Sequence, residues 1–281
     1  MPYVTIAIPF YNSESFLEYA VLSVINQTYT DWELLLIDDG STDSSLKIAK
    51  RYQSNKIRVI SDGMNKGLVF RLNQSVELAQ CTYYARMDAD DIMHIDRIKT
   101  QIEFMTNHPD VDVVGSDIYT IDDKNNIIAC ATKGHIPYTP IRSFSHPTIM
   151  GKTDWFRNNR YDSNYIRCED SELWLRTYRY SVFRNITTPL LFYREYGVPT
   201  FSKYLKSQLS VLKIYLRPKK YKINIISALF NIIYAIVKVM VCIICQCFGL
   251  KNVFIRSRRR AKKDFNIDQA SKDLQMAIYI K

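Results

Sequence analysis

Four short apolar segments alternate with helix-forming segments in residues 1–91, and this alternation limits the chain to a small set of folds. The segments are rich in β-branched, leucine and tyrosine residues, which favours buried strands. Between them, apolar residues recur at three- and four-residue spacing, the pattern of an amphipathic helix. This alternation predicts an α/β fold with a Rossmann-like, mostly parallel sheet and helices on both faces. The predicted strands are Tyr3–Pro9, Glu33–Ile37, Ile57–Ile60 and Tyr83–Arg86.

Polar residues cluster where these strands are predicted to end, at Pro9–Asn12, Asp38–Asp43 and Asp88–Asp91. In sheets of this kind, ligands bind outside the carboxyl ends of the strands. The three carboxylates of the last cluster repel one another unless a cation lies between them. Carboxylate oxygens suit Mg²⁺ or Mn²⁺, and the phosphates of a bound diphosphate would complete the coordination shell. The cluster therefore predicts a divalent-metal site, with an acidic surface turn as the alternative.

The pattern changes after the acidic cluster. Apolar residues between Ile95 and Met105 predict a helix, and Val111–Gly115 begins a set of strands that we expect to be antiparallel. A second acidic pair, Glu169-Asp170, stands at the start of another predicted helix. Because acidic residues in a first turn also stabilise the helix dipole, helix capping is the simplest explanation of this pair.

The basic charge of the chain is confined to its C-terminal part. Residues 200–281 hold 17 Lys or Arg and 3 Asp, a net charge of +14, whereas residues 1–199 carry −4. Ile223–Leu250 is almost continuously apolar apart from residues such as Lys238, and the basic run Arg256–Lys263 follows it. These features predict amphipathic, membrane-associating helices. A membrane span, which Lys238 disfavours, a segment lying in the interface and a packed helical pair all remain open.

The cysteines and the N-terminus indicate the compartment. Six cysteines show no paired framework, and no signal peptide precedes the first strand, so we expect a reducing, cytoplasmic location. Cys242, Cys245 and Cys247 lie in an apolar run without histidine or acidic ligands, which favours packing over a metal site. Together with the basic tail, these features predict a peripheral or monotopic protein on the inner face of the cell membrane.

Five motifs occur in the order and spacing typical of one enzyme family. They are Ile8–Asn12, Asp38–Asp43, Asn65–Gly67, Met87–Asp91 and Glu169–Trp174. With these motifs, residues 3–195 resemble the family 2 glycosyltransferases, inverting enzymes of the GT-A fold that build bacterial surface polysaccharides. The resemblance implies a GT-A domain over residues 1–199, divided into a nucleotide-binding half (1–91) and an acceptor-binding half (92–199). The tail, residues 200–281, lies outside the resemblance.

The resemblance also implies a donor site. Pro9, Tyr11 and Asp39 would contact the base and ribose of a nucleotide-diphospho-sugar, with Glu14 and Lys66 as further candidates. An aromatic edge can cover a base, and a carboxylate can accept a hydrogen bond from a uracil N–H or a ribose hydroxyl. A UDP-sugar is therefore the expected donor.

Asp88 and Asp90 correspond to the Asp-x-Asp pair of the family. The resemblance makes Asp90 the direct metal ligand and places Asp88 against the ribose or a metal-bound water. The implied cofactor is Mn²⁺ or Mg²⁺, which would neutralise charge on the departing diphosphate. Asp170 corresponds to the general base for the acceptor hydroxyl, and Glu169, turned elsewhere, would position the acceptor or order the loop. One base and no covalent nucleophile imply a single displacement that inverts the anomeric centre.

The implied acceptor is a glycan or a lipid-linked glycan. His146 and Trp174 are candidate acceptor-binding residues, each with a packing role as its alternative. His94 is expected to be a loop or packing residue. Surface positions are expected for three arginines of the polar loop, Arg157, Arg160 and Arg167.

Other functions have weaker support. No Gly-rich phosphate loop lies near Pro9–Asn12, which disfavours a sugar nucleotidyltransferase, and no G-x-G-x-x-G follows the first strand, which disfavours a dehydrogenase. The arginine run adjoins an apolar segment and is not interleaved with stacking aromatic residues, so nucleic acid is not the expected partner. A catalytically inactive, membrane-bound sugar-nucleotide-binding protein remains an alternative, although Asp90 and Asp170, whose loss would mark it, are present.

Overall fold

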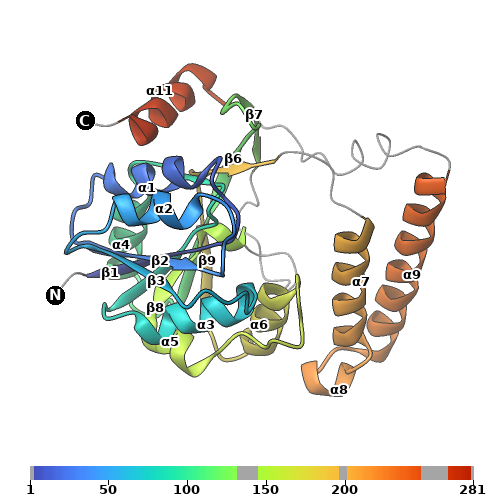
Figure 1. Ribbon diagram of the computed structural model, residues 1–281. Helices are drawn as coiled ribbons and strands as arrows, with labels where there is room; N and C mark the ends of the chain where they lie inside the picture. The colour runs from blue at the N-terminus through green and yellow to red at the C-terminus, as the bar shows by residue number, and fades with distance from the viewer. Residues whose placement is uncertain (1–2, 132–144, 196–200, 248–264, 280–281) are drawn as a thin grey trace.

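The computed structural model describes residues 3–131, 145–195, 201–247 and 265–279, and the core of this described part is a nine-stranded mixed sheet (Figure 1). The strands lie in the order β3-β2-β1-β4-β8-β6-β9-β5, and β7 pairs with β6. The strands are β1 (Val4–Phe10), β2 (Trp32–Asp38), β3 (Ile57–Ser61), β4 (Tyr83–Arg86), β5 (Ile92–Met93), β6 (Val113–Ile121), β7 (Ile127–Ala131), β8 (Met150–Lys152) and β9 (Phe183–Arg194). The helices are α1 (Leu17–Ile25), α2 (Ser45–Arg51), α3 (Leu68–Leu78), α4 (Arg97–Asn107), η1 (His146–Thr148), α5 (Thr153–Asn158), α6 (Glu169–Thr177), α7 (Phe201–Tyr215), α8 (Pro218–Tyr221), α9 (Ile225–Cys247) and α11 (Ile267–Ile278).

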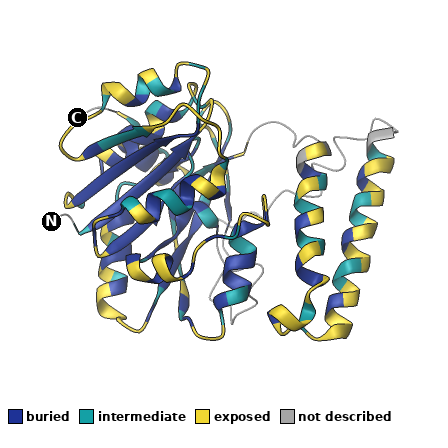
Figure 2. Cartoon of the chain, turned by 60° about the horizontal axis from the view of Figure 1, so that its bottom comes forward, coloured by how far each residue is buried: buried dark blue, intermediate teal, exposed yellow. Residues whose placement is uncertain are grey.

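The strands β3, β2, β1 and β4 are parallel, which confirms the predicted first half of the fold. Every residue of β1 and β2 is buried, because helices cover both faces of the sheet (Figure 2). On one face, Ile6 and Leu34 pack against α1, α2 and α4. On the other face, Ala7 and Leu35 pack against α3, α5 and α6. Because helices cover both faces of the sheet, the side chains on both faces are apolar. This explains the continuous apolar runs in the sequence.

Beyond β4 the sheet becomes mixed. β8 is antiparallel to β4 and to β6, and β6 is antiparallel to β7, as expected for the strands that follow Val111. β6 and β9, however, are parallel, with Val113 opposite Phe183, so the expectation of antiparallel strands is wrong for this pair. Between these two strands the chain passes through β7, η1, β8, α5 and α6. A connection of that length allows the chain to return in the same direction.

The helices α7, α8 and α9 form a hairpin beside the sheet domain (Figure 1). α9 covers most of the apolar run Ile223–Leu250, whose last residues lie outside the described part, as does the basic run that follows. The segment Ile225–Cys245 is long and apolar enough to cross a membrane, by length and composition. One buried cluster joins the sheet domain to α7 and α8, and it consists of Tyr165, Cys168, Leu175, Ile214 and Tyr221.

The C-terminal helix α11 returns to the sheet domain and packs against α1 and β5. Leu274 lies in one buried cluster with Phe192. Nδ2 of Asn26 donates to the carbonyl oxygens of Ala277 and Tyr279, at 3.0 and 2.7 Å. The predicted domain boundary at residue 199 assigns α11 to the tail. In the structure, the buried face of α11 and the carbonyl oxygens at its C-terminal end contact the domain of residues 1–199.

Candidate active site

The carboxyl ends of β1, β2 and β4 lie together at one edge of the parallel half. Pro9, which is buried, lies opposite Ile37 of β2, and Ala7 lies opposite Arg86, the last residue of β4. The loops that follow these strands therefore meet at the same edge. These loops hold three of the motifs singled out in the sequence: Tyr11–Asn12, Asp39–Asp43 and Met87–Asp91.

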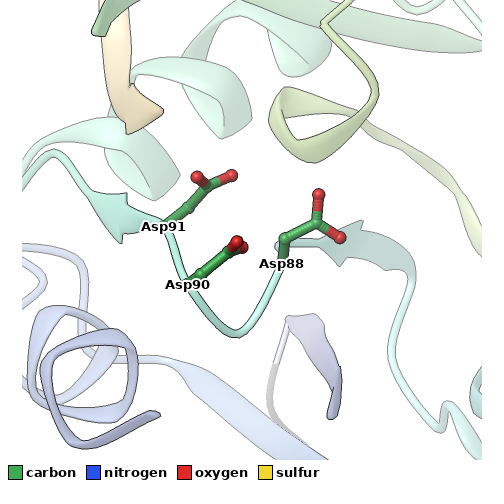
Figure 3. A group of neighbouring side chains, drawn as sticks. All are labelled: Asp88, Asp90 and Asp91. Atoms are coloured by element: carbon green, nitrogen blue, oxygen red, sulfur yellow. The ribbon is translucent and has the colours of Figure 1, made fainter. Parts of the chain in front are cut away.

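Asp88, Asp90 and Asp91 form an acidic cluster in the loop between β4 and β5 (Figure 3). One carboxylate oxygen from each lies within 4.8 Å of the others. Burial and the charge of Asp88 raise the pKa of Asp90 to about 6, and burial with both neighbouring charges raises the pKa of Asp91. Oδ2 of Asp91 is buried and has no hydrogen-bond partner among the described residues. The cluster fits a divalent cation, which would offset desolvation and repulsion, and Asp91, the third carboxylate of the predicted cluster, is a candidate ligand in addition to the Asp88 and Asp90 pair.

Two arginines hold this acidic loop. Arg86 is buried and donates from Nη2 to Oδ1 of Asp88. Arg194, at the end of β9, donates from its backbone N to Oδ1 of Asp91 at 2.8 Å and from Nε to the carbonyl oxygen of Asp90 at 2.7 Å. Sequence reasoning missed both arginines. Arg86 lies two positions before the acids and offered a local signal, whereas Arg194 lies 103 positions from Asp91 and offered none.

Asp39, directly after β2, accepts hydrogen bonds from protein groups. Oδ1 accepts from the backbone N of Lys66 at 2.8 Å and from Nε of Arg71 at 2.9 Å, and Oδ2 accepts from the backbone N of Gly67 at 3.0 Å. The same arginine pairs with Asp62, after β3, through Nη2 and Oδ1 at 2.6 Å. Asp39 thus joins the end of β2 to the start of α3. An oxygen that accepts one hydrogen bond keeps a lone pair, so Oδ2 can accept from a further donor.

The predicted donor residues Tyr11, Glu14 and Lys66 are all exposed. The side chain of Tyr11 is exposed, so its ring is accessible to a planar base. Nζ of Lys66 lies 2.8 Å from Oδ2 of Asp62. Oε2 of Glu14 accepts from the backbone N of Ser44 at 2.9 Å, just before α2. Glu14 therefore orders the turn after β2, whereas the exposed ring of Tyr11 can contact a ligand.

The acid pair at the start of α6 divides into a buried and a partly exposed residue. Glu169 is buried, and Oδ1 of the partly exposed Asp170 accepts from the backbone N of Ser171 at 2.7 Å. Burial, then the charge of Asp170, raises the pKa of Glu169 to about 7, and Arg86 and Asp88 are close enough to affect this pKa. Oε2 of Glu169 has no hydrogen-bond partner among the described residues. Glu169 therefore lies near the acidic cluster, on the side where Arg86 contacts Asp88.

His146 and Trp174 lie close together near α6. Nε2 of His146 lies 2.9 Å from the hydroxyl oxygen of Tyr161. Burial, with the charge of Arg86, lowers the pKa of His146 well below its ordinary value. Trp174 is buried, stacks on Trp155 with ring centroids 6.1 Å apart, and lies edge-on to His146 at 6.2 Å. Trp174 is thus a packing residue of α6 that supports the imidazole of His146.

His94 and three arginines, Arg157, Arg160 and Arg167, contact residues outside the acidic cluster. Nε2 of His94 lies 3.2 Å from Oδ2 of Asp273 on α11, so His94 is a packing residue, as predicted. The three arginines each contact a polar side chain: Arg157 contacts Asp154, Arg160 contacts Glu77 and Arg167 contacts Ser207. These contacts support the expected surface role of the arginines.

A mixed sheet with a parallel first half, an acidic loop after β4 and an acid pair at the start of α6 are the features of the GT-A glycosyltransferase class. The chain matches the family model described as glycosyl transferase family 2 over residues 5–184, well over half of its length, and it belongs to this family. The resemblance seen in the sequence motifs is thereby confirmed.

Known relatives support this assignment. EpsE of Bacillus subtilis, a glycosyltransferase by its description, is 34% identical over 185 residues, which cover 62% of this chain and 66% of EpsE. TuaG of Bacillus subtilis, described as a teichuronic acid biosynthesis glycosyltransferase, is 31% identical over 153 residues, 47% of this chain and 61% of TuaG. The crystal structure of TarS from S. aureus in complex with UDP-GlcNAc shares the fold, with a TM-score of 0.60, 19% identity and coverage of 75% of this chain and 66% of that chain. This chain spans about two thirds of the length of these proteins or slightly less.

Proposed function

We propose that this protein transfers a sugar from a nucleotide-diphospho-sugar, in particular a UDP-sugar, to a hydroxyl group of a glycan or a lipid-linked glycan. One observation carries the proposal: the acidic cluster and the acid pair of α6 meet at Arg86, which contacts Asp88 and lies close enough to Glu169 to affect its pKa. The complex of TarS with UDP-GlcNAc supports the donor class, and the description of TuaG supports a polysaccharide acceptor.

On the donor side, the exposed ring of Tyr11 covers the base, and Oδ2 of Asp39 accepts from the base or the ribose. Asp90, Asp88 and Asp91 would hold Mn²⁺ or Mg²⁺ next to the diphosphate. The bound ion supplies positive charge that stabilises the departing diphosphate. Arg86 and Arg194 keep the acidic loop in place for this task.

On the acceptor side, Asp170 takes the proton of the acceptor hydroxyl at its carboxylate. The hydroxyl oxygen then forms a bond to the anomeric carbon while the bond from that carbon to the diphosphate oxygen breaks. Because attack occurs on the face opposite the diphosphate, the configuration of the anomeric centre inverts. Glu169, buried next to Arg86, orders the start of α6, and His146 lines the acceptor side with support from Trp174.

The place of action in this proposal is the inner surface of the cell membrane. The apolar helix α9 and the basic residues of the tail favour contact with anionic lipids, where lipid-linked acceptors are present. Nucleic acid is not part of the proposal, since the sheet domain carries a net negative charge.

A donor screen tests the proposed function. The purified full chain is incubated with Mn²⁺ and a panel of UDP-, GDP- and dTDP-sugars, and nucleotide release is measured with and without EDTA. We expect release from one UDP-sugar, its loss with EDTA, and a product of inverted anomeric configuration by NMR. Calorimetric binding of a donor without release or transfer would instead identify an inactive sugar-nucleotide-binding protein. Retained activity in EDTA would contradict the metal assignment.

A further inference from the structure

The outer face of α9 is apolar along the helix. Thirteen residues of α9 are exposed among the described side chains, and twelve of them are large and apolar, Ser227 being the exception. The buried residues Ala228, Ala235 and Cys242 recur every seven positions, about two helical turns, and form the stripe that packs against α7. A helix this apolar is not stable with its outer face in water, so a partner must cover it.

The contacts of α7 oppose a membrane span of α9. α7 lies between α9 and the sheet domain, and the two helices run side by side (Figures 1 and 2). Oγ of Ser210 donates to the carbonyl oxygen of Ile166 at 2.8 Å, and Nζ of Lys213 donates to the carbonyl oxygen of Asn164 at 3.3 Å. α7 is therefore attached to the sheet domain. If α9 crossed a bilayer, it would either separate from α7 or draw α7 and its lysines into the hydrocarbon.

The position of α11 opposes a span independently. This helix follows α9 in the chain and contacts the sheet domain through Asn26, which donates to the carbonyl oxygen of Ala277, and through the pair of His94 with Asp273. If α9 crossed the bilayer, the connecting residues 248–264 would have to return through it. Seven of these residues are Lys or Arg, and each is costly to place at the bilayer centre. Both ends of α9 therefore lie on the side of the sheet domain.

The charge of the hairpin indicates which partner covers the outer face of α9. Residues 201–247 contain eight Lys or Arg and no Asp or Glu. Four of these cations are exposed immediately before α9: Arg217, Lys219, Lys220 and Lys222. Anionic headgroups complement this charge, whereas a second copy of the hairpin would bring eight further positive charges against it. The charges therefore favour an anionic lipid surface over self-association.

We infer that α9 lies in the plane of an anionic bilayer surface, with its outer face in the acyl region and the cations around α8 on the headgroups. α7 then separates α9 from the sheet domain, and the protein is attached to one leaflet without crossing the membrane. The inference rests on the proposed function for the membrane as the place of action, while the contacts of α7 and α11 supply the geometry.

Vesicle flotation tests the lipid-binding surface. The purified full chain should float with vesicles of phosphatidylglycerol and phosphatidylcholine, and about tenfold less with phosphatidylcholine alone. The double substitution Ile226→Asp and Ile233→Asp should reduce flotation about tenfold or more, since it places two carboxylates on the apolar face. Ile128→Asp, at an exposed isoleucine of β7, is the matched control and should float like the parent chain. Thermal unfolding confirms that each variant folds.

Different results would contradict the lipid-binding surface and the proposed function. Absence of flotation of the parent chain would overturn the inference. A concentration-dependent dimer in light scattering that is abolished by the same two substitutions would assign this face to a second copy and would overturn it too. Nucleotide release is measured separately, so loss of activity with intact flotation counts against the proposed function alone.

Cysteine labelling tests the topology. Ser54→Cys, on the sheet domain, and Gln275→Cys, on α11, are both exposed positions, and the parent chain is the blank for its own cysteines. With a membrane-impermeant maleimide, neither added cysteine should react in intact cells, and both should react in inverted membrane vesicles. Labelling of Gln275→Cys in intact cells would show that α9 crosses the membrane.

Discussion

Arg71 and Asp39 form a buried ion pair at the carboxyl-end edge of the parallel strands, with Nε of the arginine 2.9 Å from Oδ1 of the aspartate. The guanidinium is fully buried, and it also binds Asp62 after β3 at 2.6 Å. Asp39 accepts in addition from the backbone N of Lys66 and Gly67. One arginine therefore fixes the ends of two parallel strands and the start of α3 relative to one another.

Removing this cation should destabilise the fold strongly. Arg71→Met should lower the free energy of unfolding by about 3–5 kcal/mol, because it leaves Asp39 buried without its partner. Arg51→Met is the matched control, since it removes an exposed arginine that pairs with Glu18 at 3.2 Å, and should cost less than about 1 kcal/mol. Urea unfolding of both variants measures the difference. Equal losses of unfolding free energy in the two variants would mean that burial of the Arg71–Asp39 pair contributes nothing to stability.

The acidic cluster predicts that Asp91→Asn is more stable than the parent chain without metal and less stable than the parent chain with metal. Without metal, Asp91→Asn should raise the free energy of unfolding near pH 7 by about 1 kcal/mol, because it removes one of three crowded carboxylates. With Mn²⁺ at 100 times its dissociation constant, the parent chain should gain about 2.7 kcal/mol, and the variant should gain much less. Thermal unfolding with and without Mn²⁺ measures both effects. The exposed Asp123→Asn should respond to Mn²⁺ like the parent chain, and a similar response of Asp91→Asn would remove Asp91 from the ligands.

Glu169 predicts a pH dependence of stability. Its pKa is raised from 4.5 to about 7 in the folded state, so the folded protein binds this proton more tightly than the unfolded chain. The stabilising contribution is complete below pH 4.5 and is lost as the pH rises to about 7. Glu169→Gln removes the titration, so the stability of the variant relative to the parent should rise by up to roughly 3 kcal/mol between pH 4.5 and pH 8.

Urea unfolding of metal-free protein across this pH range checks the prediction. The exposed Glu103→Gln is the control, and its stability relative to the parent chain should stay nearly constant with pH. A constant difference between Glu169→Gln and the parent chain would show that the pKa of Glu169 is the same in the folded and unfolded states, and would contradict its desolvation by the fold.

The parallel half of the fold could be predicted because its signals are local. β4 spans Tyr83–Arg86, the predicted residues, since a strand buried on both faces is a short continuous apolar run. The acids that follow the strand were singled out for the same reason, as their position at a strand end is visible in the sequence. The direction of β9 relative to β6 was not predictable in this way, because it depends on a connection that passes through five other elements of the described part.

The residues that sequence reasoning missed act through contacts between distant positions. Arg194 reaches Asp91 across 103 positions, and Asn26 binds the carbonyl oxygen of Tyr279 across 253. Neither Arg194 nor Asn26 belongs to a sequence motif or to a repeating pattern of apolar residues. The burial of Glu169 similarly depends on where Arg86 lies after β4 is placed in the sheet. Such contacts can be identified only in the packed structure, because the fold, and not the spacing along the chain, determines which residues meet.

Asp170 provides the sharpest test of the catalytic assignment. Asp170→Asn should lower kcat by about 10²–10⁴ while the donor dissociation constant stays nearly unchanged, because a general base acts on the acceptor proton and not on donor binding. Asp154→Asn is the matched control, since Asp154 is also an acid in the first turn of a helix and is exposed. It should retain parental turnover. Steady-state kinetics and donor calorimetry measure both quantities. If Asp170→Asn kept parental turnover and lost only about 1 kcal/mol of stability, as expected for an acid at a helix N-terminus, Asp170 would be a capping residue and the base would lie elsewhere.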